Sequence, residues 1–268
     1  MKLNKVETYS EYSALVDRYR KKGTVSNDYI QREVADLIVH DSLFYRCEKE
    51  NIFFFVRKDG FYRLYFYIND FLSPFEVSED QFVTEILFRG DLSAVSEEIR
   101  YLQSCGFQEN VVRDQYFAKY ISIIPGITPT GVEIDIAQSL PEVEWAADLF
   151  NSSFDRWSGD YISKDLCKLL FNEKLIITCK DCLGSLLGAC HVEVFRGANW
   201  LRHIAVSENA RGRGVGMALL NAFIEKGHEN DESRYMLWVQ RNNLAAVNMY
   251  KKRGFTYLGK STLSMIKF

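Results

Sequence analysis

A short segment rich in arginine and glycine restricts the possible folds of this chain more than any other feature. Residues 201–206 form a mostly apolar run, residues 211–216 read Arg-Gly-Arg-Gly-Val-Gly, and an amphipathic helical pattern continues to about residue 227. The first N–H groups of such a helix have no acceptor within the helix and lie at the positive end of its dipole. Because glycines let the main chain approach a ligand closely, the segment predicts a strand–loop–helix unit that binds a phosphate.

Two better-known glycine loops do not fit this segment. A dinucleotide loop, G-x-G-x-x-G, starting at Gly212 would need glycine at position 217, where Met217 stands. A P-loop, G-x-x-x-x-G-K-[ST], occurs nowhere in the chain. The pattern that does fit is Arg-x-x-Gly-x-Gly, formed by Arg211, Gly214 and Gly216.

A second signature follows after one more apolar run. Residues 243–255 match the pattern N-x-x-A-x-x-x-Y-x-x-x-G-F, with Asn243 at its start and Tyr250 at its tyrosine. Together the two motifs resemble those of the GNAT superfamily of acyl-CoA-dependent acetyltransferases, and the resemblance covers roughly residues 132–268. The alternative interpretation of the first motif is a helix with a frayed, glycine-rich start.

The resemblance implies acetyl-CoA as the cofactor and assigns residues to it. Main-chain groups of one strand would pair with the pantetheine arm, and the next strand, at 236–239, would diverge to leave a slot for the thioester. Main-chain amides of the loop would hold the pyrophosphate. The implied cofactor residues are Ile204, Ala205, Val206, Arg211, Gly212, Arg213, Gly214, Val215, Gly216, Met217, Asn243 and Tyr250.

Tyr250 matches the family's tyrosine that protonates the departing thiolate. The chemistry agrees, because a thiol with a pKa near ~8.5 and a phenol near ~10 can exchange a proton usefully. A tyrosine in the middle of a helix can also be a plain packing residue. No carboxylate lies on the strand before the loop, so His203 on that strand and Glu193 on the preceding one are the candidate general bases. A water-relayed proton, or an amine that arrives neutral, stays open.

Proline and glycine at residues 124–131 mark the best domain boundary. We therefore predict a domain at 1–126 and an acetyltransferase domain at 127–268. Helices are expected in the first half at 10–21, 28–39 and 93–104, with a hairpin at 53–66 and strands at 82–88 and up to 124. Helices are expected in the second half at 139–150, 163–172, 214–227 and 243–253, with strands at 132–137, 174–179, 186–195, 200–206, 235–240 and 255–267. This is an α/β pattern with a mixed sheet.

The two halves share a weak similarity in sequence. Gly106 and Gly254 each end a helical pattern before a phenylalanine, and each is followed fourteen residues later by an aromatic residue. Chance and duplication both explain it. The resemblance favours tandem GNAT-like domains with a degenerate first copy, since the Arg-x-x-Gly-x-Gly motif is absent before residue 130 and Leu102 stands at the position of Tyr250. We expect this copy to form a wall of the acceptor pocket or to support the second half. The segment 151–162 is expected to be an acceptor-binding loop or a plain surface loop.

The amino-acid composition limits the classes of partner that the chain is expected to bind. The 268 residues include 33 Lys and Arg against 36 Asp and Glu, so the chain lacks the basic excess of nucleic-acid binders. It shows neither a signal peptide nor a run long enough to span a bilayer, so we expect no membrane partner and a cytoplasmic location. Cys179 and Cys182 form a C-x-x-C without a second ligand pair, so no metal site is predicted.

The predicted function is transfer of an acetyl group from acetyl-CoA to a primary amine by direct attack. The acceptor is a small-molecule or peptide amine that the sequence does not identify, and the oligomeric state is equally open. Two alternatives remain: an acyl-CoA-binding sensor without catalysis, and an aminoacyl-tRNA-dependent transferase. The acidic net charge and the intact phosphate loop argue against the second.

Overall fold

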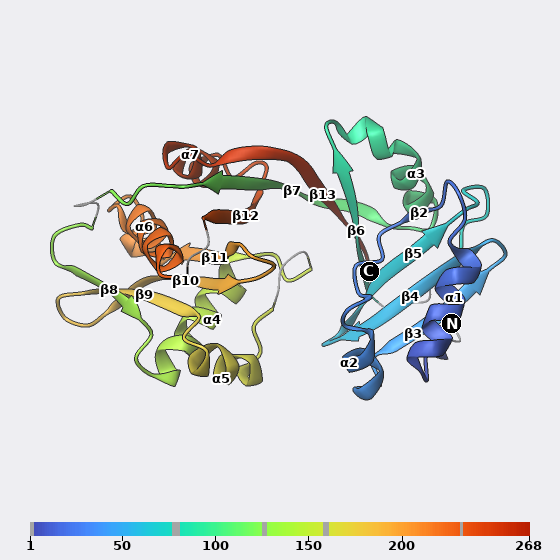
Figure 1. Cartoon of the computed structure of the whole chain (residues 1–268), viewed down its shortest axis with the longest axis horizontal. Helices are drawn as coiled ribbons and strands as arrows, with labels where there is room; N and C mark the ends of the chain where they lie inside the picture. Colours follow the sequence, from blue (N-terminus) through green and yellow to red (C-terminus); the bar gives the residue numbers. More distant parts are fainter. Residues whose placement is uncertain (1–2, 77–80, 125–127, 158–160, 231–232) are drawn as a thin grey trace. The chain divides into compact units, whose positions relative to one another are not determined.

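The chain consists of two compact units, each a mixed sheet with helices on both faces (Figure 1). The computed structural model describes residues 3–76, 81–124, 128–157, 161–230 and 233–268. The first unit comprises Met1–Val112 together with Lys260–Phe268, and the second comprises Arg113–Gly259. The predicted α/β class with a mixed sheet is confirmed.

The first unit has the strand order β1-β3-β4-β5-β6-β13, with β2 beside β5. All neighbours are antiparallel except β5 and β6, which run parallel only from the pair Tyr62 and Phe82 to the pair Leu64 and Thr84. The strands are β1 (Asn4–Lys5), β2 (Val25–Ser26), β3 (Leu43–Glu48), β4 (Asn51–Lys58), β5 (Phe61–Ile68), β6 (Phe82–Arg89) and β13 (Thr256–Lys267). The helices are α1 (Tyr9–Tyr19), α2 (Val34–Val39), a 3-10 turn (Leu92–Val95) and α3 (Ser96–Ser104).

Strand β4 shows why this sheet is covered on both sides. Phe53 and Phe55 pack in one cluster with Leu102 of α3, whereas Phe54 packs in another with Val16 of α1. Successive side chains of a strand point to opposite faces, so a run of apolar residues needs a cover on each face.

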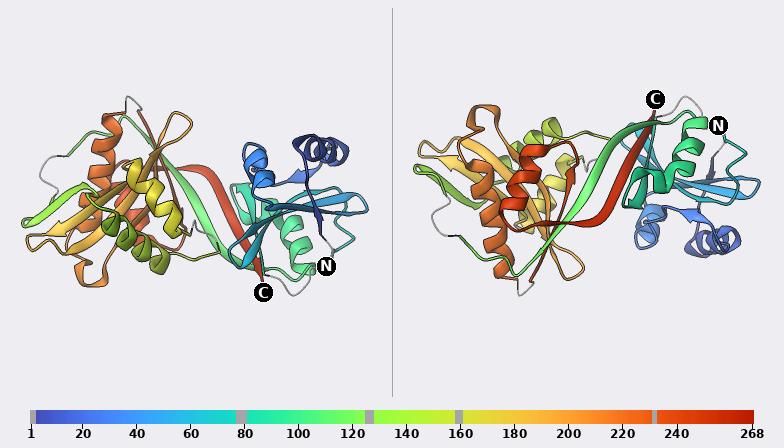
Figure 2. Two further views of the ribbon diagram at one scale, coloured as in Figure 1. Left: turned by 90° about the horizontal axis from the view of Figure 1, so that it is seen from below. Right: turned by 90° about the horizontal axis from the view of Figure 1, so that it is seen from above.

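The second unit has the strand order β7-β12-β11-β10-β9-β8. Its strands are residues 113–119 of β7 (Gln108–Lys119), β8 (Val132–Ile136), β9 (Ile176–Asp181), β10 (Leu186–Val194), β11 (Asn199–Val206) and β12 (Arg234–Gln240). Helices α4 (Leu140–Ser153) and α5 (Lys164–Asn172) cover one face, and α6 (Val215–His228) and α7 (Leu244–Lys252) cover the other (Figure 2). Here too the sheet is antiparallel except for one short parallel pair, β11 with β12.

The two units share one helix ending, at the glycines that carry the similarity between the halves in sequence. Gly106 ends α3 at φ +89° and Gly254 ends α7 at φ +86°. In both places the phenylalanine after the glycine donates its N–H to a carbonyl in the last turn, that of Leu102 at 3.0 Å and that of Tyr250 at 3.1 Å. This is the same helix ending, and it makes Leu102 the structural counterpart of Tyr250.

Each unit contains one strand supplied by the other half of the sequence. Strand β7 follows α3 but pairs with β12 in the second unit, and the end of β13 follows α7 but pairs with β6 in the first. The predicted boundary at 126 and 127 lies outside the described residues. The compact units are divided differently because these two strands are exchanged.

Two predicted elements in the first half are wrong in part. Residues 121–124 do not form a strand, because their main chain bonds to side chains instead: His228 contacts the Ile121 carbonyl at 2.7 Å and Arg253 donates to that of Ser122 at 3.0 Å. The helix expected at 28–39 begins only at Val34, because Asp28 is held by the Tyr12 and Tyr67 hydroxyls and accepts the Ile30 N–H in a turn. Strand β3 was not expected.

Candidate active site

The short parallel pair of the second unit opens into two diverging strands. Pairing of β11 with β12 ends at Leu201 and Leu237, although β11 continues to Val206 and β12 to Gln240. At the same point β11 contains one extra residue, Arg202, because His191 of β10 pairs with His203 while Val192 pairs with Leu201. Such a bulge bends a strand and increases its twist, which turns β11 away from β12.

A cavity of about 580 Å³ lies at this opening. Its lining includes residues from the ends of β11 and β12, from the start of α7, from the segment after α4 and from β7. Its residues are Arg113, Ser153, Phe154, Asp155, Trp200, Leu201, Arg202, His203, Ile204, Ala205, Val206, Arg211, Gly216, Trp238, Val239, Gln240, Asn243, Ala245, Ala246, Met249 and Tyr250. The cavity therefore brings together many of the residues that the resemblance selected from two distant motifs.

The glycine loop has the backbone that an anion cradle requires. Gly212 and Gly214 adopt φ of +75° and +83°, a region that side chains disfavour. Gly214 is the N-cap of α6, and no side chain caps this helix start within the described residues. The amide groups of the first turn can therefore bind a ligand. Arg211 and Gly216 line the cavity, whereas the Val215 side chain is buried in the core.

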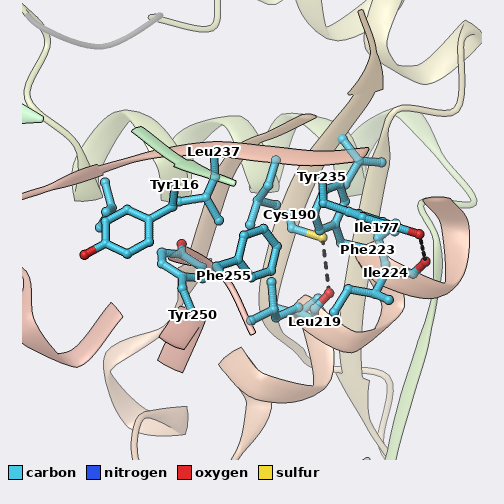
Figure 3. Close-up of a cluster of buried hydrophobic side chains, with 14 of the residues drawn as sticks. Tyr116, Ile177, Cys190, Leu219, Phe223, Ile224, Tyr235, Leu237, Tyr250 and Phe255 are labelled. Carbon is cyan, nitrogen blue, oxygen red and sulfur yellow. Dashed lines mark hydrogen bonds between the residues drawn. The ribbon is translucent and has the colours of Figure 1, made fainter. Parts of the chain in front are cut away.

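Tyr250 lies between the core and the cavity. It is 4% exposed, packs edge-on against Phe255 in the apolar cluster that also holds Tyr116 and Leu237, and lines the cavity (Figure 3). Burial raises the pKa of its phenol above the ordinary value, and Cys190 nearby adds a smaller contribution in the same direction. The hydroxyl therefore stays protonated at neutral pH and is able to donate.

The two candidate bases occupy different places. His203 lines the cavity and is 7% exposed, with its ring stacked on Phe150 at 5.1 Å between centroids. Glu193 is absent from the cavity lining, and its carboxylate is held by Arg202, whose Nε lies 2.6 Å from Oε1. Of the two candidates, His203 is therefore the one that lines the cavity.

Asn243 both lines the cavity and caps a helix. Its Oδ1 accepts the N–H of Ala246 at 3.1 Å, so it is the N-cap of α7, and it also lines the cavity.

Two substitutions of Asn243 separate these roles. Asn243→Ala should lower the free energy of unfolding by about 1 kcal/mol through loss of the cap, whereas Asn243→Ser should keep the cap and the stability. If the amide also contacts the coenzyme, both variants will bind acetyl-CoA more weakly in calorimetry. Equal stability of the Ala and Ser variants in urea unfolding would contradict the capping role.

Several lining residues were not predicted. Arg113 comes from β7 and reaches the cavity only because that strand joins the second unit, so no local pattern could have indicated it. Gln240 ends β12 past its pairing with β11, whereas Trp238 lies in the segment 236–239 that the resemblance placed beside the slot. Of the segment 151–162, Ser153, Phe154 and Asp155 line the cavity, and residues 158–160 are outside the described part of the chain.

The matching opening in the first unit is closed by the side chain of Asn27. Asn27 is 2% exposed and bridges β5 and β6 just where their parallel pairing ends. Its Oδ1 accepts the N–H of Phe66 at 2.7 Å, and its Nδ2 donates to the Thr84 hydroxyl and the Glu85 carbonyl, both at 2.9 Å. Residues 69–81 join β5 to β6, and their described part contains no counterpart of α6. This supports a first copy without a phosphate-binding role.

Cys179 is buried and Cys182 is exposed. Among the described residues there is no group of three or more His, Cys, Asp or Glu side chains placed to hold a metal ion. No helix within those residues has both the length and the apolar character needed to cross a bilayer.

Comparison with known proteins agrees with this geometry. The model of the acetyltransferase (GNAT) family matches residues 141–255. The uncharacterized N-acetyltransferase YobR of Bacillus subtilis is 38% identical over 72 residues, which are 27% of this chain and 29% of that protein. The aligned part is thus under a third of that relative's length.

Two solved structures share the fold over most of the chain. A GCN5-related N-acetyltransferase from Sphaerobacter thermophilus has a TM-score of 0.66 at 13% identity, covering 98% of this chain and 94% of that one. A tandem GNAT protein from the clavulanic acid biosynthesis pathway has a TM-score of 0.55 at 10% identity, covering 84% and 82%. Residues 141–255, in the second unit, therefore match the acetyltransferase (GNAT) family, and the chain shares its fold with these two solved structures over most of its length.

Proposed function

We propose that this protein transfers an acetyl group from acetyl-CoA to a primary amine of a small molecule or peptide, by direct attack in a ternary complex. The observation that carries the proposal is the cavity between β11 and β12. Arg211 from the loop before α6, Gly216 from the first turn of α6, and Tyr250 all line it.

The fit to acetyl-CoA rests on three parts of this cavity. The uncapped start of α6, with Gly214 in the left-handed region, suits a diphosphate. Beyond Leu201 the edge of β11 is no longer paired to β12, so main-chain groups of residues 204–206 are placed to pair with the amides of a pantetheine arm. The diverging ends of β11 and β12 leave room for a thioester between them.

Acetyl-CoA supplies an activated acyl carbon and a thiolate leaving group. The chain's residues hold it and move protons. The loop amides and Arg211 would fix the diphosphate, and Asn243 would stand beside the arm. Tyr250 would give its phenolic proton to the departing sulfur, since its raised pKa keeps it loaded with that proton.

An acceptor amine must lose a proton before it attacks, because a primary amine is mostly an ammonium ion at neutral pH. We assign this task to His203 rather than Glu193, because the histidine lines the cavity, whereas Glu193 does not and its carboxylate is paired with Arg202. The aromatic and charged residues Phe154, Asp155 and Trp238 line the same cavity and would contact the acceptor.

Calorimetry with acetyl-CoA, followed by a thiol-release assay over a panel of amines, tests the proposal. The panel contains free amino acids, peptides with free N-termini, aliphatic polyamines and aminoglycosides. We expect acetyl-CoA binding, thiol release with at least one amine, and a mass increase of one acetyl group on that amine. Binding without transfer to any amine would favour an acyl-CoA sensor, and failure to bind would contradict both.

A further inference from the structure

Two histidines face each other on adjacent strands of the second unit. His191 of β10 is the register partner of His203 of β11, next to the bulge at Arg202. Their rings are nearly parallel, at 13°, with centroids 5.6 Å apart and the two Nδ1 atoms at 3.4 Å. One Nδ1 carries the hydrogen that the other accepts, because two N–H groups aimed at each other at this distance would repel. The contact therefore holds a single proton between the two rings.

The surroundings of the two rings are mostly apolar, so a positive charge on His203 depends on this hydrogen bond for its stability. The rings are 7% and 8% exposed, and Phe150 and Phe154 lie against His203 with centroids at 5.1 and 5.3 Å. An imidazolium buried against apolar rings is unfavourable unless its N–H groups have acceptors. The Nδ1 atom of neutral His191 is such an acceptor, and a hydrogen bond from a charged donor is stronger than one from a neutral donor.

Charged and titratable groups also lie around the pair. Glu193 and Arg202 are ion-paired on the same two strands. Besides Arg202, those that line the two cavities touching His203 include Arg113, Asp155, Arg156, Tyr161 and Tyr250. On the other side of β10, His191 is paired with Ile176 of β9, which is apolar. The direct acceptor at Nδ1 is therefore the neighbouring imidazole.

We propose that His191 and His203 act as one proton-accepting pair, in which His203 takes the proton from the acceptor ammonium and His191 is the positioning residue behind it. The inference rests on the proposed acetyl transfer and deepens it. His203 lines the cavity, whereas His191 does not, so only His203 touches the substrate. A base oriented by a second hydrogen-bonding group is the general arrangement of such catalysis.

Protons and bonds balance over the proposed reaction. The ammonium gives one proton to His203, whose Nδ1–H then donates to His191, and the pair later releases this proton to solvent. The neutral amine attacks the thioester carbonyl, a C–N bond forms, and the C–S bond breaks. The new amide nitrogen loses its second proton, the sulfur takes one from Tyr250, and Tyr250 is reprotonated, so that one proton is released per acetyl group transferred.

Two substitutions of His191 test the pair. Leucine removes the acceptor, whereas asparagine can place an oxygen near the former Nδ1 but cannot itself be protonated. With the best amine of the panel above, His191→Leu should lower kcat at pH 7 by roughly tenfold or more, and His191→Asn by less than about threefold. Without the acceptor the imidazolium is less stable, so the pKa of His203 falls. The acid limb of the pH profile should therefore move to lower pH in the leucine variant only.

Acetyl-CoA affinity, measured by calorimetry, shows whether each variant is folded at the site. Unchanged kcat and an unchanged acid limb in a leucine variant that still binds would overturn the proposal. So would equal losses in the two variants, because a purely structural role does not distinguish an oxygen acceptor from a methyl group in this way.

Nuclear magnetic resonance of the wild-type protein provides a test that needs neither variant nor amine. The chain has only 4 histidines, so the ring nitrogens of His191 and His203 can be assigned against His40 and His228. We expect the two rings to titrate in mutually dependent steps, and independent single-step titrations would overturn the pair. A wild-type protein that fails to bind acetyl-CoA contradicts the proposed function instead, and the ring titration still reports on the pair itself.

Discussion

Replacing Tyr250 by phenylalanine is expected to reduce turnover roughly 10²–10⁴-fold, the usual contribution of a positioned general acid, while acetyl-CoA affinity stays nearly the same. The ring remains in the apolar cluster against Phe255, so packing is kept and only the proton donor is lost. Burial raises the pKa of this phenol, so the wild-type enzyme should show no loss of rate from Tyr250 ionisation up to about pH 9. Steady-state thiol release with calorimetric binding would measure both effects.

Tyr235→Phe is the matched control. Tyr235 belongs to the same core cluster, but its hydroxyl donates to the Ile224 carbonyl at 3.2 Å and it is absent from the cavity lining. This variant should lose about 1 kcal/mol of stability and keep its turnover. Should Tyr250→Phe turn over like the wild type, Tyr250 would be a packing residue and the acid would have to be sought elsewhere.

The second large effect is expected for Gly214→Glu, which should weaken acetyl-CoA binding by roughly 100-fold or more, or about 2.7 kcal/mol. Gly214 has φ +83°, and a Cβ there would lie 3.3 Å from Cγ of Pro129. The substitution also places a carboxylate beside the amides that would hold the diphosphate, so strain and charge repulsion act together.

Gly254→Glu controls for backbone strain alone. Gly254 has nearly the same φ, +86°, with no atom within 4 Å of an added Cβ, and it ends α7 rather than beginning α6. The Gly254→Glu variant should be destabilised about as much as the Gly214→Glu variant, but it should keep its affinity for acetyl-CoA. Tight acetyl-CoA binding by a folded Gly214→Glu protein would rule out the loop as the diphosphate site.

The features that sequence predicted best are those with local causes. The spacing of Gly214 and Gly216 fits a loop that leads from a strand into a helix. Gly254 before Phe255 marks a helix end, and the structure confirms its geometry. Strand β8 and helix α5 lie close to their predicted ranges, and the structure adds the Ser163 cap, whose hydroxyl accepts the Leu166 N–H. Ser139, the N-cap of α4, makes no side-chain cap bond, and Glu142 accepts from Gln138 and pairs with Lys180.

What sequence did not predict depends on long-range pairing. The apolar patterns of β7 and β13 are the same whichever sheet they join, so their exchange, and with it the place of Arg113 in the cavity, had no local signal. His191 stands in an apolar strand at no motif spacing from His203, and only the antiparallel register brings the two rings together. Asn27 likewise looks like a turn residue, although it is buried between two strands.

The exchanged strands have a consequence for inheritance. A gene cut between residues 124 and 128 would yield two products, each lacking the strand that its sheet takes from the other half of the sequence. Neither copy could then be lost, borrowed or fused to another protein without leaving an open row of main-chain groups, which invites aggregation. Deleting either half of the chain should therefore destabilise the sheet that remains.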